Sequence, residues 1–147
     1  MSEIKESLTG RRIAGIDFGT KRIGIAVCDE LHISVNPVRT IHTEKSSIFD
    51  EVRSTLLSER VSAVVIGMPD TYDGQKKDFH NKIKTFGNVI KNQLNLDVFY
   101  VDESFSSLQA ASFMVNYGIK KKDRSKKGML DQYAAVIILQ QFLTELE

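Results

Sequence analysis

Hydrophobic positions fall into short alternating or continuous runs over the first third of the chain, which is the pattern of β-strands. Two further runs follow later. One of them is continuously apolar, as is typical of a strand that is buried on both faces. Pro37 lies inside the third run and indicates a strand that is at a sheet edge or bulged. The expected strands cover residues 12–18, 23–28, 33–41, 61–67 and 97–101.

Apolar residues spaced three or four positions apart indicate helices between and after these strands. Ser46 and Ser47 can cap the first helix, whose first turn is acidic. Small residues at 134 and 135 would let the last helix lie close to the sheet. The expected helices run from the Ser46–Ser47 cap to about Arg60, from after Lys77 to about Leu94, from Leu108 to Tyr117 and from Met129 to about Leu146.

Three strands followed by alternating helices and strands predict an α/β fold. We expect an antiparallel meander joined to right-handed crossovers, which gives a mixed five-stranded sheet with helices on both faces. Such three-layer sheets bind ligands at the carboxyl ends of their parallel strands, near the point where the strand order reverses. The length of 147 residues suits a single domain, 1–147, with residues 1–10 as a flexible N-terminal extension.

Composition narrows the class of protein further. The chain is 41% hydrophobic and 27% charged, as in ordinary globular proteins. No apolar run approaches the roughly 20 residues that span a bilayer, and the first residues lack the apolar core of a signal peptide. Cys28 is the single cysteine, which excludes an internal disulfide and a thiolate metal cluster. We therefore expect a cytoplasmic protein that does not insert into a membrane.

The charges are unevenly distributed although the net charge is only +1. One segment before the last helix carries six cations and a single acid. It can attract a polyanion such as nucleic acid, because the local field matters more than the total charge. A solvated loop with no partner is the alternative. The cations are Lys120, Lys121, Lys122, Arg124, Lys126 and Lys127.

Three acids stand where the predicted fold could bring them together. Asp17 ends the first strand, Glu103 follows the last strand, and Asp131 begins the last helix. Each has a simpler interpretation: a turn aspartate, a solvated strand end and a carboxylate at a helix N-terminus. If they converge, they repel one another and raise their pKa values unless a cation lies among them.

Oxygen ligands without histidine or cysteine select a hard ion, Mg²⁺ or Mn²⁺. Two such ions about 3.5–4 Å apart activate water and stabilise the leaving oxygen of a phosphodiester. The chemistry that fits is metal-dependent hydrolysis of a nucleic-acid backbone, with the basic segment holding substrate phosphates.

Aromatic residues offer less. Phe79, Phe86 and Phe99 follow the periodicity of a core, so we interpret them as packing residues and not as platforms for bases. Phe105 follows Glu103 and could stack on a base, although packing is its simpler role.

Several motifs in order carry a family resemblance. They are the run Gly15-Ile16-Asp17-Phe18-Gly19-Thr20-Lys21-Arg22-Ile23-Gly24-Ile25-Ala26, then Val65-Ile66-Gly67-Met68-Pro69 followed by Asp73-Gly74, then Val101-Asp102-Glu103, and finally the basic segment leading into Asp131 and Ala134-Ala135. With these motifs the chain resembles the YqgF/RuvX family of ribonuclease-H-like proteins, relatives of the RuvC Holliday-junction resolvases. The resemblance extends from about Arg11 to Leu143.

This resemblance implies a ribonuclease-H-like fold with Asp17, Glu103 and Asp131 as catalytic, metal-binding acids. It also implies a bacterial cytoplasmic nuclease that matures the 5′ end of precursor 16S rRNA, in contact with pre-30S ribosomal particles. Cleavage of Holliday junctions in branched DNA is one alternative, and a catalytically weak nucleic-acid-binding assembly factor is another. Trimming an RNA end requires only a monomer, whereas symmetric junction cleavage suggests a homodimer, so we expect a monomer or weak homodimer.

One position departs from the family pattern, because Ser104 stands where the family usually has arginine after Asp102-Glu103. Arginine can hold a phosphate with two parallel hydrogen bonds, and serine cannot. We expect Lys21, Arg22 or the basic segment to supply the missing cation.

Overall fold

The computed structural model describes residues 2–44, 47–69, 76–103, 112, 114–116, 118–124 and 128–147. In this part of the chain five strands form one mixed sheet in the order β3-β2-β1-β4-β5. They are β1 (Ile13–Phe18), β2 (Arg22–Cys28), β3 (Val35–His42), β4 (Ala63–Met68) and β5 (Asp97–Asp102).

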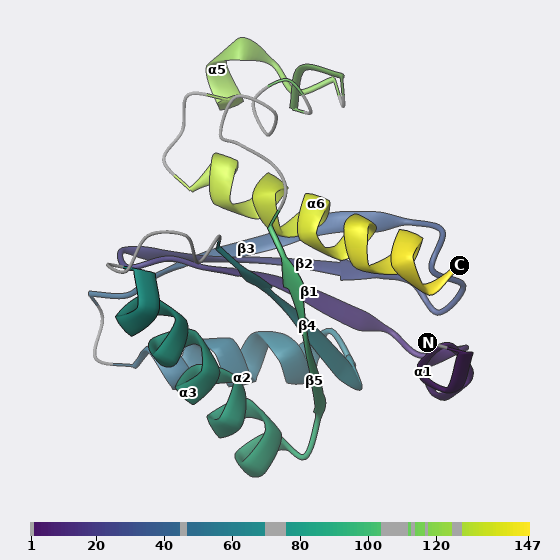
Figure 1. Cartoon of the computed structure of the whole chain (residues 1–147). Coiled ribbons are helices and arrows are strands. Elements are labelled where there is room, and N and C mark those ends of the chain that lie inside the picture. Colours follow the sequence, from purple (N-terminus) through teal and green to yellow (C-terminus); the bar gives the residue numbers. More distant parts are fainter. Residues whose placement is uncertain are drawn as a thin grey trace.

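Helices cover both faces of this sheet. Figure 1 shows α6 across one face, with α2 and α3 on the opposite face. The expected mixed sheet with helices on both faces is therefore confirmed. The helices whose two ends lie in the described residues are α1 (Ser2–Leu8), α2 (Ile48–Ser58), α3 (Lys76–Leu94), α5 (Lys121–Arg124) and α6 (Met129–Leu146).

The central strand β1 is the point where the strand order reverses. It pairs antiparallel with β2 on one side and parallel with β4 on the other, and β4 in turn pairs parallel with β5. The carboxyl ends of β1, β4 and β5 therefore meet at one edge of the sheet, which we call the carboxyl edge. Open α/β sheets bind their ligands at such an edge.

The edge strand β3 has the irregularity expected from its proline. It pairs only with β2, and the pairing register shifts between Ile25 and Ala26, opposite the stretch that contains Pro37. Proline lacks an N–H for the ladder, so an edge or a bulge is where a strand tolerates it.

Alternate residues of the strands fill two separate cores. Ile13, Ala26 and Val65 point toward α6, whereas Ile16 and Ile66 point toward α2 and α3. All five are fully buried. Because successive side chains of a strand point to opposite faces, a single strand such as β1 contributes to both cores.

Three glycines allow α6 to lie close to the sheet. A side chain at Gly24 of β2 would meet the backbone of Asp131, and one at Gly15 of β1 would lie 2.7 Å from the carbonyl oxygen of Ala135. On β4, a Cβ at Gly67 would lie 2.8 Å from an oxygen of Glu103. The small residues 134 and 135, which we expected to permit this contact, are buried. The glycines of the strands are the small residues on the sheet side of the same contact.

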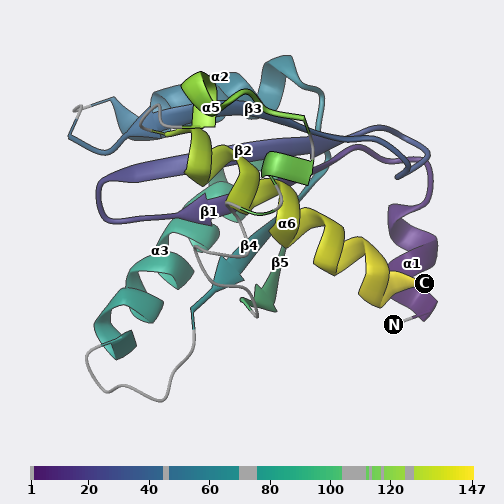
Figure 2. The same cartoon turned by 90° about the horizontal axis from the view of Figure 1, so that it is seen from above.

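The N-terminal segment differs from the flexible extension expected for residues 1–10. Ser2–Leu8 forms α1, and Leu8 is fully buried in the core on the α6 side. Figure 2 shows α1 beside the C-terminal end of α6. These residues bury an apolar side chain in the core formed with a helix that lies far away in the sequence.

Two helix details also differ from expectation. Ser47 is the N-cap residue of α2, but its side chain makes no capping hydrogen bond, and Ser46 lies outside the described residues. The last helix, α6, buries more than the small residues 134 and 135, since Tyr133, Val136 and Phe142 are buried too. No helix in the described ranges is long and apolar enough to span a bilayer.

We predict that Gly24→Ala destabilises the protein by about 1–3 kcal/mol, the usual cost of overpacking. The new methyl group would collide with backbone atoms of Asp131, which cannot rotate away, so the start of α6 would have to shift. Urea unfolding measures the loss.

Gly67→Ala is the matched control. Its methyl group would meet the ends of the Ile138 and Glu103 side chains, which can rotate. A loss equal to that of Gly24→Ala would contradict the backbone explanation.

Candidate active site

Asp17 lies at the carboxyl edge, one residue before the end of β1. It is paired in register with Gly24 of β2, so its side chain points to the face that α6 covers. The absence of a side chain on Gly24 lets the first turn of α6 approach this point. The local fold thus places the carboxyl group of Asp17 between the sheet and the start of α6.

Glu103 reaches the same place from β5. Its backbone N–H donates a hydrogen bond of 2.8 Å to the carbonyl oxygen of Met68, which fixes the chain as it leaves the strand. Its side chain extends over Gly67, with Oε1 only 2.8 Å from the position that a Cβ of Gly67 would occupy. Gly67 therefore leaves the space through which Glu103 approaches Asp17.

Asp17 and Glu103 act on one another. The pKa of Asp17 is raised to about 8, chiefly by burial and then by the negative charges of Glu103 and Asp131. The protonated Asp17 also donates a hydrogen bond to the Glu103 side chain. The mutual repulsion expected from the sequence is thus present at Asp17, which holds a proton near neutral pH when no cation is bound.

Asp131 lies in the first turn of α6 and is paired with a cation of the chain itself. Its Oδ2 accepts a hydrogen bond of 2.7 Å from Nε of Arg22 at the start of β2. The Arg22 side chain is 34% exposed and that of Asp131 is 20% exposed, so the ion pair is partly shielded from water. Arg22 therefore neutralises one of the three acids.

The donor set fits a hard divalent ion. Asp17 and Glu103 supply carboxylate oxygens, which Mg²⁺ and Mn²⁺ prefer, and the raised pKa of Asp17 indicates that positive charge is favourable there. As their side chains stand, no three acids, histidines or cysteines among the described residues form a cluster that could hold a metal. The third acid, Asp131, is bound to Arg22 instead.

The structure describes only part of the basic segment. Lys120, Lys121 and Lys122 are exposed, and α5 contacts α6 on the α6 side of the sheet (Figure 1). Lys21 is exposed on the β1–β2 turn at the carboxyl edge. The side chain of Arg124 and the whole of Lys126 and Lys127 lie outside the described residues.

Other expectations also fall outside the described residues. They include the substituted position Ser104, the neighbouring Phe105 and the turn Asp73-Gly74. Most of the helix expected at 108–117 does as well.

Sequence reasoning missed two contacts of the site. Arg22 was expected to contact nucleic acid, and the structure pairs it with Asp131. Gly67 was read as part of a strand stop, and its role in admitting Glu103 was not foreseen. The run Gly67-Met68-Pro69 did indicate a strand end, but no local pattern predicts which side chain lies over Gly67.

Comparison with known proteins assigns this arrangement to a family. The sequence pattern of the RuvX family, described as Holliday junction resolvase, matches residues 11–145. A protein of Bacteroides fragilis described as "Putative pre-16S rRNA nuclease" is 37% identical over 133 residues, covering 90% of this chain and 95% of its own. A protein of Flavobacterium psychrophilum with the same description is 37% identical over 134 residues, covering 90% and 96%.

A solved structure shares the fold. Thermus thermophilus RuvC in complex with a Holliday junction substrate superimposes with a TM-score of 0.62, covering 92% of this chain and 96% of its own, at 15% identity. At that identity the likeness establishes a RuvC-like fold and nothing more.

We predict that the buried acid destabilises the metal-free protein at high pH. The folded pKa of Asp17, about 8, lies above its ordinary value of 3.8. Its contribution to stability is therefore fully present below about pH 4 and is lost as the pH rises to about 8.

Asp17→Asn removes this dependence. With chelator present, we expect the variant to exceed the wild type in free energy of unfolding at pH 8 by about 1.4 kcal/mol or more, the equivalent of one pKa unit. The difference should shrink toward pH 5. Urea unfolding at both pH values measures it, with Glu30→Gln at an exposed position as the control. A constant difference between the two pH values would contradict the pKa assignment.

Proposed function

The chain belongs to the RuvX family, and on that premise we propose that it is a metal-dependent nuclease that processes the 5′ end of precursor 16S rRNA. The observation that carries the proposal is Asp17 at the carboxyl edge, a half-buried acid beside Glu103 whose pKa is raised to about 8. Buried acids with strongly raised pKa values mark functional sites more often than structural ones.

The three acids have distinct tasks in this proposal. Asp17 and Glu103 would hold Mg²⁺ or Mn²⁺ with their carboxylate oxygens, and Asp131 would complete the ligand set from α6. Two bound ions activate water and stabilise the oxygen that leaves the phosphodiester. Arg22 positions Asp131 through its 2.7 Å contact and brings a positive charge to the edge where substrate phosphates would lie.

Cations of the chain would supply the phosphate contacts. Lys21 on the β1–β2 turn and Lys120, Lys121 and Lys122 are exposed at the surface. Arg124, Lys126 and Lys127 extend the basic segment in the sequence. Binding that rests on such contacts weakens steeply as the salt concentration rises.

Precursor rRNA is the preferred substrate because the two relatives, each covering 90% of the chain, carry that name. The proposed setting is the bacterial cytoplasm, with pre-30S particles as partners and a monomer or weak homodimer as the active form. The family description favours a second candidate, resolution of Holliday junctions in branched DNA. The serine at 104 keeps a third reading open, a nucleic-acid-binding assembly factor with weak catalysis.

A cleavage assay separates these three functions. We predict that the wild-type protein with Mg²⁺ or Mn²⁺ trims the 5′ end of precursor 16S rRNA, and that chelator abolishes trimming. Asp17→Asn should lower the rate at least about 100-fold, since carboxylate ligands hold the catalytic ions. Glu30→Gln should leave the rate unchanged.

A synthetic four-way junction is assayed in parallel. Cleavage of the junction alone would replace the rRNA assignment with the second candidate. Salt-sensitive RNA binding without cleavage under any metal condition would favour the assembly factor. Equal rates for wild type and Asp17→Asn would overturn the assignment of the acids.

A further inference from the structure

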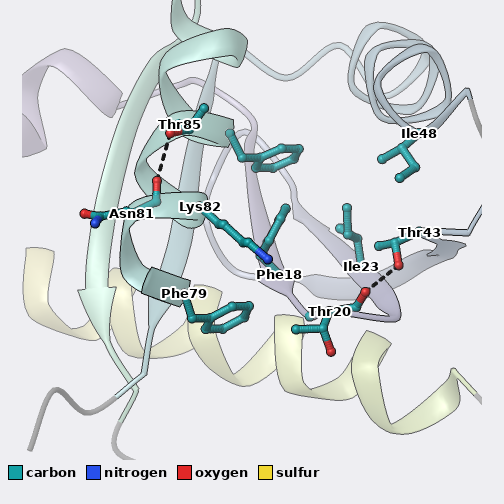
Figure 3. Close-up of a pocket in the computed structure, with 11 residues that line it drawn as sticks. Phe18, Thr20, Ile23, Thr43, Ile48, Phe79, Asn81, Lys82 and Thr85 are labelled. Carbon is teal, nitrogen blue, oxygen red and sulfur yellow. Dashed lines mark hydrogen bonds between the residues drawn. The ribbon is translucent and has the colours of Figure 1, made fainter. Parts of the chain in front are cut away.

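A pocket of about 510 Å³ opens on the face of the sheet opposite α6. It lies between the β1–β2 turn, the start of α2 and the N-terminal half of α3 (Figure 3). Its volume falls in the range of sites for small ligands, about 300–1,000 Å³. Its apolar walls are formed by Phe18, Ile23, Ile48, Phe79 and Phe86.

The phenylalanines of this pocket are only partly buried. The ring of Phe18 lies 4.8 Å from that of Phe86 and 6.0 Å from that of Phe79, with tilted planes. All three pack against the core and also line the pocket. We interpreted Phe79 and Phe86 from the sequence as core residues, which describes half of their environment. Partly exposed aromatic faces in a pocket can stack on a flat ligand.

The charge of the pocket favours an anion. Lys82 reaches from α3 across the opening in Figure 3, and it forms no ion pair or hydrogen bond with any residue that the structure describes. No carboxylate is among the residues that line the pocket. The hydroxyls of Thr43 and Thr85 donate to backbone carbonyls at 2.6 and 2.9 Å, so Lys82 is the one cation among the described residues that line the pocket, beside the polar side chains of Thr20 and Asn81.

The pocket and the acids are adjacent across the edge of the sheet. Phe18 directly follows Asp17, and consecutive side chains of a strand point to opposite faces. Asp17 thus faces α6 while Phe18 faces the pocket, at the same carboxyl edge. A nucleic-acid strand with one phosphate at the acids can extend a neighbouring base over this edge of the sheet and into the pocket.

We propose that the pocket binds the base of one unpaired nucleotide in the substrate strand, close to the scissile phosphate. The base lies against Phe79 and Phe18, and Lys82 contacts an adjoining phosphate. This assignment rests on the nuclease function proposed above and adds a substrate preference to it. A base inside a duplex is paired and stacked and cannot enter, so the pocket selects single-stranded or unpaired substrate.

Binding measured without cleavage tests the pocket directly. We use a labelled, unstructured RNA of about ten nucleotides in chelator and follow its anisotropy. Phe79→Leu keeps an apolar side chain but removes the stacking face, and it should weaken binding about tenfold. Phe99→Leu is the matched control, because Phe99 packs on Phe142 on the α6 face, away from the pocket.

The cation is tested in the same assay. Lys82→Met should weaken binding and reduce its dependence on salt, whereas Lys84→Met should do neither. Lys84 is exposed on the same helix and does not line the pocket. Equal effects of the two lysine variants would overturn the role of Lys82.

Abasic substitution identifies the occupant. Removing single bases in turn should weaken binding to the wild type about tenfold at one or two positions and leave the others unchanged. In Phe79→Leu the loss at those positions should disappear, because the base and the ring act as a pair. Affinity that is insensitive to every abasic position would overturn the proposal and leave the pocket to another occupant, such as an apolar side chain of a protein.

The result is separable from the nuclease assignment. If the protein cleaves RNA but Phe79→Leu binds it as the wild type does, the pocket assignment fails and the function stands. If no metal supports cleavage but the abasic pattern is found, the pocket assignment holds and the nuclease assignment fails, so the protein binds nucleic acid without cleaving it.

Discussion

The contact between the backbone of α6 and the glycines of the central strands brings Asp131 to the carboxyl edge. Gly24 and Gly15 have no side chains, so the helix lies against β2 and β1 closely enough that a methyl group would collide with its backbone. This contact carries Asp131, in the first turn of the helix, to the edge that Asp17 occupies. Interiors pack too densely to absorb even one extra methylene at such a point without a shift.

Concentrating negative charge at this edge has an energetic cost, and the protein offsets it in two ways. Asp17 retains a proton, with a pKa near 8, and Asp131 is paired with Arg22 at 2.7 Å. Both arrangements reduce the net negative charge of the acids without a bound metal ion. Glu103 joins the pair only because Gly67 leaves its path open.

The two faces of the sheet present different kinds of side chain at this edge. One face presents carboxylates beneath α6, and the other presents partly exposed phenylalanines beneath α3. A single strand, β1, serves both, since Asp17 and Phe18 are neighbours that point in opposite directions. In the proposed complex, alternation along a strand joins the face that binds phosphate to the face that binds a base, with no additional element. Such a division suits a polymer whose charge and whose flat bases lie on different sides of its backbone.

Hydrophobic alternation is local and connections follow few rules. The strands, their order and the placement of Asp17 and Glu103 at strand ends could therefore be predicted from the sequence. The partners of the acids depend on tertiary packing and could not be predicted. Arg22 and Asp131 lie 109 positions apart, and no local pattern records that they meet. The helix Ser2–Leu8 and the partial exposure of Phe79 and Phe86 likewise depend on what packs against each residue. The periodicity of apolar residues predicts which side of a helix or strand is buried. Which side chains contact one another depends on how closely the helices pack on the sheet.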